Sequence, residues 1–197
     1  MTDAIPSERL VHVPLGERAY DILIGPGWSG SGPDHWQSWI EGLIGAQRVH
    51  QDDWSRPDID SWSARVDGAI VAQARPVWLV AHSFGCLASV VSASRQPDRI
   101  AGALLVAPAS PDRFGITPRI PDAALPFPAV LAASRNDPWM KFMSAAHWAE
   151  RWGARLVDLG EAGHVNPESG HGPWPAGLEL FRQLQASAPA MSGSLQD

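Results

Sequence analysis

The feature that most constrains this chain is an unbroken apolar run, Val77–Ala81, followed by the turn-like sequence His82-Ser83-Phe84-Gly85. Five consecutive apolar residues without alternation are typical of a central parallel strand that is buried on both faces of a sheet. The residues from Gly85 to Arg95 then favour a helix. We therefore expect the serine to stand on a sharp turn between a buried strand and a helix, where small neighbours are needed.

Apolar strands and amphipathic helices alternate along the rest of the chain. Strands are predicted at residues 20–24, 47–51, 77–81, 101–106, 129–133 and 155–159. Helices are predicted around residues 36–43, 62–70, 85–95, 145–152 and 177–185, the first of them with Pro33 in its opening turn. This alternation predicts an α/β fold with a mostly parallel sheet of about six strands and helices on both faces.

Length and local composition favour a single domain. A chain of 197 residues can bury one full core but not two. We predict an N-terminal arm at residues 1–18, the folded domain at 19–186 and a flexible C-terminal tail at 187–197. The proline-rich stretch 108–128 is the one long insertion, and we expect it to form at most a minimal cap. Whether this stretch moves as a lid is not decided by the sequence.

Charge and cysteine content argue against several classes of protein. The net charge is −6 and Lys141 is the single lysine, so the chain offers no basic stripe for nucleic acid. No segment approaches the ~20 apolar residues of a membrane span and no signal peptide is evident, so we expect a cytoplasmic protein with no membrane partner. The lone Cys86 cannot form an internal disulfide or half of a zinc pair, and no histidine spacing suggests a metal.

Ser83 is the candidate nucleophile. A serine hydroxyl reacts poorly until a histidine takes its proton, and that histidine needs a carboxylate to fix its tautomer. In α/β-hydrolases the three residues follow in the chain order serine, acid, histidine, with the last two on loops after later strands. A serine ahead of a helix is also a common helix cap, so the positions of the partners decide between the two interpretations.

Asp137 and His164 occupy those two positions. Asp137 follows the strand predicted at 129–133, and His164 follows the last predicted strand. An aspartate before a proline can also simply stabilise a turn, and Asp112 is the second choice for the acid. His171 is the second choice for the base, and its role stays open. The other histidines are interpreted as locally packed or ordinary polar residues: His35, His50, His82 and His147.

The tetrahedral intermediate of such a reaction needs two preorganised backbone donors. One comes from the residue after the nucleophile and the other from the loop after the first strand, which assigns the amides of Phe84 and Trp28 to an oxyanion hole. Trp28, Phe84 and Trp139 flank the candidate residues in sequence, and we hypothesise that they form an apolar pocket for the acyl group. The alternative is that these aromatic rings belong to the core.

A dinucleotide site is a competing interpretation. The run Gly25–Gly30 matches G-x-G-x-x-G, and Asp52 follows at about the distance that such a site requires. In a dinucleotide fold, however, the helix opens inside the motif, whereas Pro33 favours a later start. This alternative also leaves the positions of the serine, aspartate and histidine without an explanation. We expect no cofactor.

Several runs occur together: Gly25-Pro26-Gly27-Trp28, His35-Trp36-Gln37, His82-Ser83-Phe84-Gly85-Cys86, Asn136-Asp137-Pro138, and Gly163-His164-Val165-Asn166 through Gly170-His171-Gly172-Pro173-Trp174-Pro175. Over residues 19–185 the sequence thereby resembles the family of small serine hydrolases that includes retinoblastoma-binding protein nine and YdeN. The resemblance implies a triad of Ser83, Asp137 and His164, small ester or amide substrates and no cofactor.

The sequence therefore predicts a single-domain α/β-hydrolase that cleaves small carboxylic esters or amides through an acyl-enzyme on Ser83. Its expected partner is a small-molecule substrate, and a protein partner is left open. A non-catalytic protein-interaction module on the same fold is the alternative from another class of protein.

Overall fold

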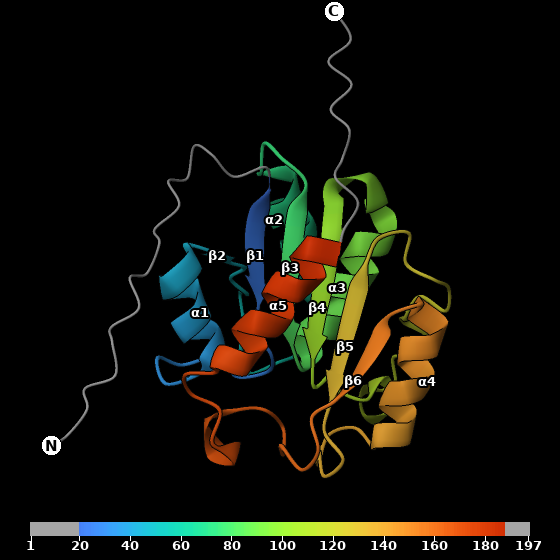
Figure 1. Ribbon diagram of the computed structural model, residues 1–197. Coiled ribbons are helices and arrows are strands. Elements are labelled where there is room, and N and C mark those ends of the chain that lie inside the picture. Colours follow the sequence, from blue (N-terminus) through green and yellow to red (C-terminus); the bar gives the residue numbers. More distant parts are fainter. Residues whose placement is uncertain (1–19, 188–197) are drawn as a thin grey trace, which may run out of the picture.

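The computed structural model describes residues 20–187, which form a six-stranded parallel sheet between two layers of helices (Figure 1). The strands are β1 (Asp21–Gly25), β2 (Gln47–Arg48), β3 (Val77–His82), β4 (Ile100–Val106), β5 (Ala129–Ala133) and β6 (Arg155–Asp158). The α-helices are α1 (Trp36–Ile44), α2 (Ile59–Val71), α3 (Phe84–Arg95), α4 (Phe142–Trp152) and α5 (Pro175–Ser187). The strand order is β2-β1-β3-β4-β5-β6 and every neighbouring pair is parallel, so the predicted α/β fold class is confirmed.

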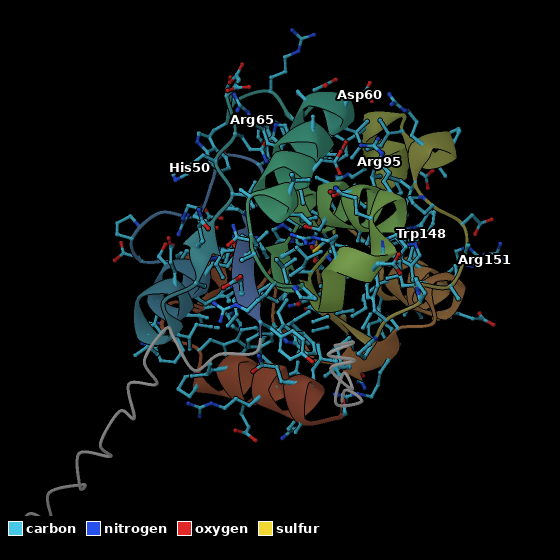
Figure 2. All side chains as sticks on the ribbon, turned by 90° about the horizontal axis from the view of Figure 1, so that it is seen from above. His50, Asp60, Arg65, Arg95, Trp148 and Arg151 are labelled. Atoms are coloured by element: carbon cyan, nitrogen blue, oxygen red, sulfur yellow. The ribbon has the colours of Figure 1, made fainter. Side chains whose placement is uncertain are left out.

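Alternation along the strands divides the core between the two faces of the sheet. In β3, where all six residues are buried, Leu79 and Ala81 share a cluster with residues of α2, α3 and α4. Trp78 and Val80 share the other cluster with residues of α1 and α5. Figure 2 shows α2, which carries Asp60, on the opposite side of the sheet from the red helix α5. An unbroken apolar strand is needed because each face meets its own helix layer.

The parallel arrangement brings the carboxyl ends of the strands to one edge of the sheet, the lower edge in Figure 1. Gly25 at the end of β1 is in register with Ala81 of β3, and Val106 at the end of β4 is in register with His82. The loops after β1, β3, β5 and β6 therefore converge at this edge, where open α/β sheets bind their ligands.

The first helix begins where its predicted range 36–43 begins, but Pro33 does not lie in its first turn. α1 starts at Trp36 because the His35 side chain caps it by accepting the Gln37 N–H at 3.1 Å. Pro33 lies in the turn that precedes this cap and not in the first helical turn. The expectation that Pro33 opens the helix was wrong, because the capping side chain sets the boundary.

The second strand is shorter than the predicted range 47–51. Only Gln47–Arg48 pairs with β1. The Val49 N–H still donates to Ile24 O at 2.9 Å, but β1 ends at Gly25 and offers no further partner. The other five strands agree with their predicted ranges to within one residue at each end.

The predicted domain limits are only partly covered by the described residues. The predicted arm at 1–18 and all but one residue of the predicted tail at 187–197 lie outside them. Ser187, which was assigned to the tail, is the last residue of α5.

The proline-rich segment 108–128 is attached to two helices of the same layer. It contains two short 3-10 helices, η3 (Pro111–Phe114) and η4 (Thr117–Arg119). Arg119 forms an ion pair with Asp60 of α2, and the Trp152 indole N–H of α4 donates to Pro121 O at 2.8 Å. These contacts hold the segment against the layer formed by α2, α3 and α4.

Helix α3 approaches the loop after β1 through a glycine. A β-carbon at Gly85 would lie 2.3 Å from the carbonyl oxygens of Gly25 and Pro26, which is far inside any real contact distance. The absence of a side chain at Gly85 therefore lets the first turn of α3 and the loop after β1 pack directly against each other.

We expect Gly85→Ala to lower the free energy of unfolding by about 1–3 kcal/mol, because the added methyl group forces the helix and the loop apart. Gly68→Ala in α2 is the matched control. Nothing lies within 4 Å of its added carbon, and alanine is the better helix former by up to about 1 kcal/mol. Urea denaturation of both variants measures the difference, and equal stabilities would contradict the close approach at Gly85.

Candidate active site

Ser83 sits on a strained turn between β3 and α3. Its backbone has φ +54° and ψ −125°, a conformation that residues with a side chain rarely adopt. The Ser83 N–H donates to Val106 O at 3.1 Å, which fixes the turn against β4. The side chain makes no capping hydrogen bond to α3, so the helix-cap interpretation of this serine does not apply.

Three side chains predicted from the sequence are in hydrogen-bond contact. His164 Nε2 lies 2.8 Å from Ser83 Oγ, and His164 Nδ1 lies 2.9 and 3.0 Å from the two carboxylate oxygens of Asp137. A carboxylate only accepts, so the proton of a neutral His164 is on Nδ1, and Nε2 can accept from the serine hydroxyl. The side chains of His164 and Asp137 are at most 9% exposed, so little water reaches these bonds.

Two donors from distant segments hold the backbone around His164. Val165, the next residue, has φ +49° although it is β-branched and fully buried. The Trp36 indole N–H donates to Val165 O at 2.9 Å, and His82 Nε2–H donates to His164 O at 2.8 Å. The orientation of the candidate base therefore depends on α1 and on the residue before the serine.

Two polar side chains to which the sequence analysis assigned no role connect the loops after β5 and β6. Asn136 Oδ1 accepts the Gly163 N–H at 2.7 Å, and Ser134 Oγ accepts the Ala162 N–H at 2.9 Å. Ser134 also donates to Asn136 Oδ1 at 2.8 Å. The loop of the aspartate and the loop of the histidine thus form one unit, and no local sequence signal reveals these partners.

The loop after β1 lies against Ser83. A β-carbon at Gly27 would lie 2.7 Å from Ser83 Cβ, so only glycine fits there. The Trp28 indole N–H donates to Ser55 O at 3.0 Å and anchors the next residue of the loop. Within residues 20–187, no backbone carbonyl accepts the amide N–H of Trp28 or of Phe84. Trp28 follows the glycine that packs against Ser83, and Phe84 follows Ser83 itself, so both predicted oxyanion donors belong to segments next to the serine.

A cavity of about 480 Å³ opens onto Ser83 and His164. One wall is aromatic: the Trp28 ring meets Phe114 edge-on at 6.2 Å and Trp139 at 5.8 Å, measured between ring centroids. The Trp139 ring lies 5.9 Å from the ring of His164. Two of the three predicted pocket residues, Trp28 and Trp139, therefore line this cavity.

The side chain of Phe84 does not line the cavity. Its ring is fully buried in the core, with centroids 5.2 Å from Trp62 and 4.9 Å from Phe114. The position of Phe84 in the first turn of α3 directs the ring toward α2, which carries Trp62. Phe114, from the segment 108–128, supplies the third aromatic ring of the wall instead.

A second wall includes His35 and His82, both more than nine-tenths buried. Their ring centroids are 4.8 Å apart, and the His82 ring also lies 4.8 Å from that of His164. Burial, with Arg48 nearby, lowers the pKa of His35 to about 4. Burial and the neighbouring His164 hold the pKa of His82 well below its usual value. Both rings are therefore neutral near pH 7, and no arginine or lysine in the described part of the chain lines the cavity.

The second-choice residues have other partners. His171 Nδ1–H donates to Ser169 O at 3.1 Å, and Asp112 accepts from Thr117. Among residues 20–187, no group of three or more histidine, cysteine, aspartate or glutamate side chains could hold a metal ion. In the same part of the chain, no helix has the length and apolar character needed to cross a membrane.

The glycine-rich loop lacks the geometry of a dinucleotide site. α1 begins at Trp36, well after Gly30, instead of inside the motif. Gly27 is packed against the serine, since a β-carbon added to it would lie 2.7 Å from Ser83 Cβ. The Asp52 carboxylate accepts from Arg65 Nε at 2.9 Å in an exposed ion pair.

Comparison with solved structures identifies the class of protein. The crystal structure of a protein described as a YdeN-like hydrolase from Pectobacterium atrosepticum superposes with a TM-score of 0.83 at 40% identity, covering 86% of this chain and 93% of that one. The ydeN gene product of B. subtilis superposes with a TM-score of 0.70 at 18% identity, covering 85% and 99%, which is a likeness of fold. Fold and site together define an α/β-hydrolase.

The chain belongs to the serine hydrolase family, whose model matches residues 22–183. The predicted resemblance to YdeN is confirmed, and hydrolytic activity is supported. Neither comparison bears on retinoblastoma-binding protein nine by name.

A curated relative matches only a short part of the chain. The 3-dehydroquinate synthase of Agrobacterium fabrum is 91% identical over 23 residues, which are 12% of this chain and 6% of that protein. The chain thus spans about 6% of the length of the curated relatives that it matches, and their activity is not carried over to it.

We expect Trp36→Phe to lower both stability and kcat for a chromogenic ester. It removes the N–H that holds Val165 O, which should cost about 1 kcal/mol of unfolding free energy and loosen the loop of His164. Trp152→Phe is the matched control, since Trp152 is equally buried and donates to Pro121 O at 2.8 Å. It should lose similar stability with kcat unchanged. An equal fall in kcat for both variants would reduce the role of Trp36 to stability alone.

Proposed function

We propose that this protein hydrolyses small carboxylic esters or amides through an acyl-enzyme on Ser83. The observation that carries the proposal is the continuous hydrogen-bonded row of Asp137, His164 and Ser83 beside a cavity. A carboxylate, an imidazole and a hydroxyl in this order are what the activation of a serine requires.

In the first half of the reaction, Ser83 Oγ attacks the carbonyl carbon of the substrate while His164 Nε2 accepts the hydroxyl proton. The tetrahedral intermediate collapses, His164 passes the proton to the departing alcohol or amine, and the acyl group stays on Ser83. Water then attacks the acyl ester while His164 accepts a proton from it. The acid product leaves as that proton returns to Ser83 Oγ, and Asp137 stays ionised throughout.

Negative charge develops on the carbonyl oxygen in both halves of the reaction. We assign the amides of Trp28 and Phe84 as its donors, because they flank Ser83 and have no backbone acceptor within the described residues. The N-terminal end of α3, which begins at Phe84, adds a favourable dipole at the same place.

The cavity favours uncharged substrates with a small or aromatic acyl group. Its volume lies within the range of about 300–1,000 Å³ that is typical of small-molecule sites. The wall of Trp28, Phe114 and Trp139 offers apolar contact and edge-on packing for an acyl group. Among residues 20–187, Glu168 is the carboxylate that lines the cavity and no arginine or lysine lines it, so an anionic acyl group gains no counter-ion from the lining.

A fluorophosphonate probe tests the nucleophile, because it reacts rapidly only with an activated serine. Peptide mass spectrometry should find the adduct on Ser83 alone, and Ser83→Ala should not be labelled. Ser89→Ala is the matched control, since Ser89 is a buried serine of α3, the helix that follows Ser83, and lies outside the row. Asp137→Asn should slow ester hydrolysis by about 10⁴-fold. A folded protein that resists labelling would contradict the proposal and favour a non-catalytic interaction module.

Trp139→Ala tests the acyl pocket. We expect kcat/KM for 4-nitrophenyl benzoate to fall about three- to tenfold relative to that for 4-nitrophenyl acetate, because the aromatic acyl group loses an edge-on partner. Met143→Ala, which removes a largely exposed side chain of α4, is the control and should leave the ratio as it is. If the ratio is the same in both variants, Trp139 does not contact the acyl group.

A further inference from the structure

The second wall of the cavity carries two histidine rings, each with one nitrogen that has no hydrogen-bond partner among the described residues. His35 Nδ1 accepts the Gln37 N–H at 3.1 Å, so the proton of the neutral ring is on Nε2, which is a donor. His82 Nε2 carries a proton, because it donates to His164 O at 2.8 Å, and so its Nδ1 is an acceptor. Within residues 20–187, neither His35 Nε2 nor His82 Nδ1 has a hydrogen-bond partner.

The two rings are placed to act on one group. Their centroids are 4.8 Å apart at an interplanar angle of 62°, and both rings line the cavity. His35 is 4% exposed and His82 is 5% exposed. A ring nitrogen that belongs to a cavity wall and has no protein partner is available to bond to a ligand. One donor beside one acceptor matches a group that does both, such as a hydroxyl or a carboxamide.

Both rings are uncharged near pH 7. Burial lowers the pKa of His35 to about 4 and holds the pKa of His82 well below its usual value. A carboxylate or an ammonium group would need an opposite charge in place of its water, and neither neutral ring supplies one. The wall therefore suits a neutral polar group.

The wall formed by His35 and His82 lies on the other side of the His164 ring from the aromatic wall. The ring of His164 contacts His82 at 4.8 Å and Trp139 at 5.9 Å, so it lies between the two walls. In the proposed reaction the departing group receives its proton from His164 Nε2 and must lie next to that atom. With the acyl group against Trp28 and Trp139, the departing group extends toward His35 and His82.

We infer that His35 and His82 form a subsite for a neutral hydroxyl or carboxamide on the departing group of the substrate. The hydroxyl accepts from His35 Nε2–H and donates to His82 Nδ1, and no covalent bond changes. This inference rests on the proposed function and narrows its substrate class to esters of alcohols that carry a second neutral polar group.

Two isosteric acetates test the subsite. 2-Hydroxyethyl acetate and propyl acetate differ by a hydroxyl in place of a methyl group, and both give the same acetyl-enzyme on Ser83. Deacylation is therefore common to both, and the ratio of their kcat/KM values reports the departing group alone. We expect the wild-type enzyme to prefer the hydroxyethyl ester by about tenfold.

The variant His35→Asn tests the subsite without removing the side-chain cap of α1. Asparagine keeps a capping oxygen for α1 but lacks the Nε2–H donor, so the preference should fall to near parity. Inactive molecules do not affect the ratio of the two kcat/KM values. The intrinsic difference in reactivity between the two esters is the same for every variant, so it cancels when variants are compared. His50→Asn, at an exposed residue on the periphery of the molecule (Figure 2), is the matched control and should keep the preference.

The outcomes distinguish the subsite from the proposed function. A wild-type enzyme that is labelled at Ser83 but shows no preference overturns the subsite alone, and so does a His35→Asn variant that keeps the wild-type preference. A protein that neither reacts with the fluorophosphonate nor hydrolyses either acetate overturns the proposed function and the subsite with it.

Discussion

The hydrogen bond between His164 Nε2 and Ser83 Oγ joins segments 81 residues apart, and the fold is arranged so that it can form. This bond requires β3, β5 and β6 to run parallel, so that their carboxyl ends lie on the same side of the sheet. The complete burial of β3 places this strand in the interior, because such a strand cannot lie at a solvated edge. The strand order puts the histidine loop after β6, which is separated from β3 by two strands, so that this loop must reach across the ends of β5 and β4.

The segments that bring His164 to Ser83 contain backbone conformations that are unfavourable in themselves. Ser83 and Val165 both have positive φ, which costs of the order of 1–3 kcal/mol for a residue with a side chain. Each conformation is fixed by a specific bond: Ser83 N–H donates to Val106 O, and the Trp36 indole donates to Val165 O. Trp36 belongs to the apolar cluster shared by α1 and α5. The helix layer on that face therefore supports the candidate site as well as the core.

The parts of the site that depend on local pattern could be predicted from the sequence, and the parts that depend on distant contacts could not. An apolar run, small residues after it and the chain order of later strands are sufficient to select Asp137 and His164. The cavity walls come from several loops that no local pattern relates. Phe84 was expected in the pocket because it follows the serine, but the first turn of α3 directs it into the core, and Phe114 occupies the wall. His35 has the sequence context of an ordinary polar residue, since nothing nearby indicates that its ring will be buried.

Three imidazoles in contact would repel one another if more than one were charged, and the site avoids this by giving only one of them a carboxylate. In the proposed reaction a positive charge develops on His164, whose ring lies 4.8 Å from that of His82. Asp137 lies within 3.0 Å of His164 Nδ1, while burial keeps the pKa of His35 and of His82 low. The proton taken from Ser83 is thereby confined to His164. Because the other two rings stay neutral, the same burial that leaves His164 as the candidate base leaves them as the donor and the acceptor of the proposed subsite.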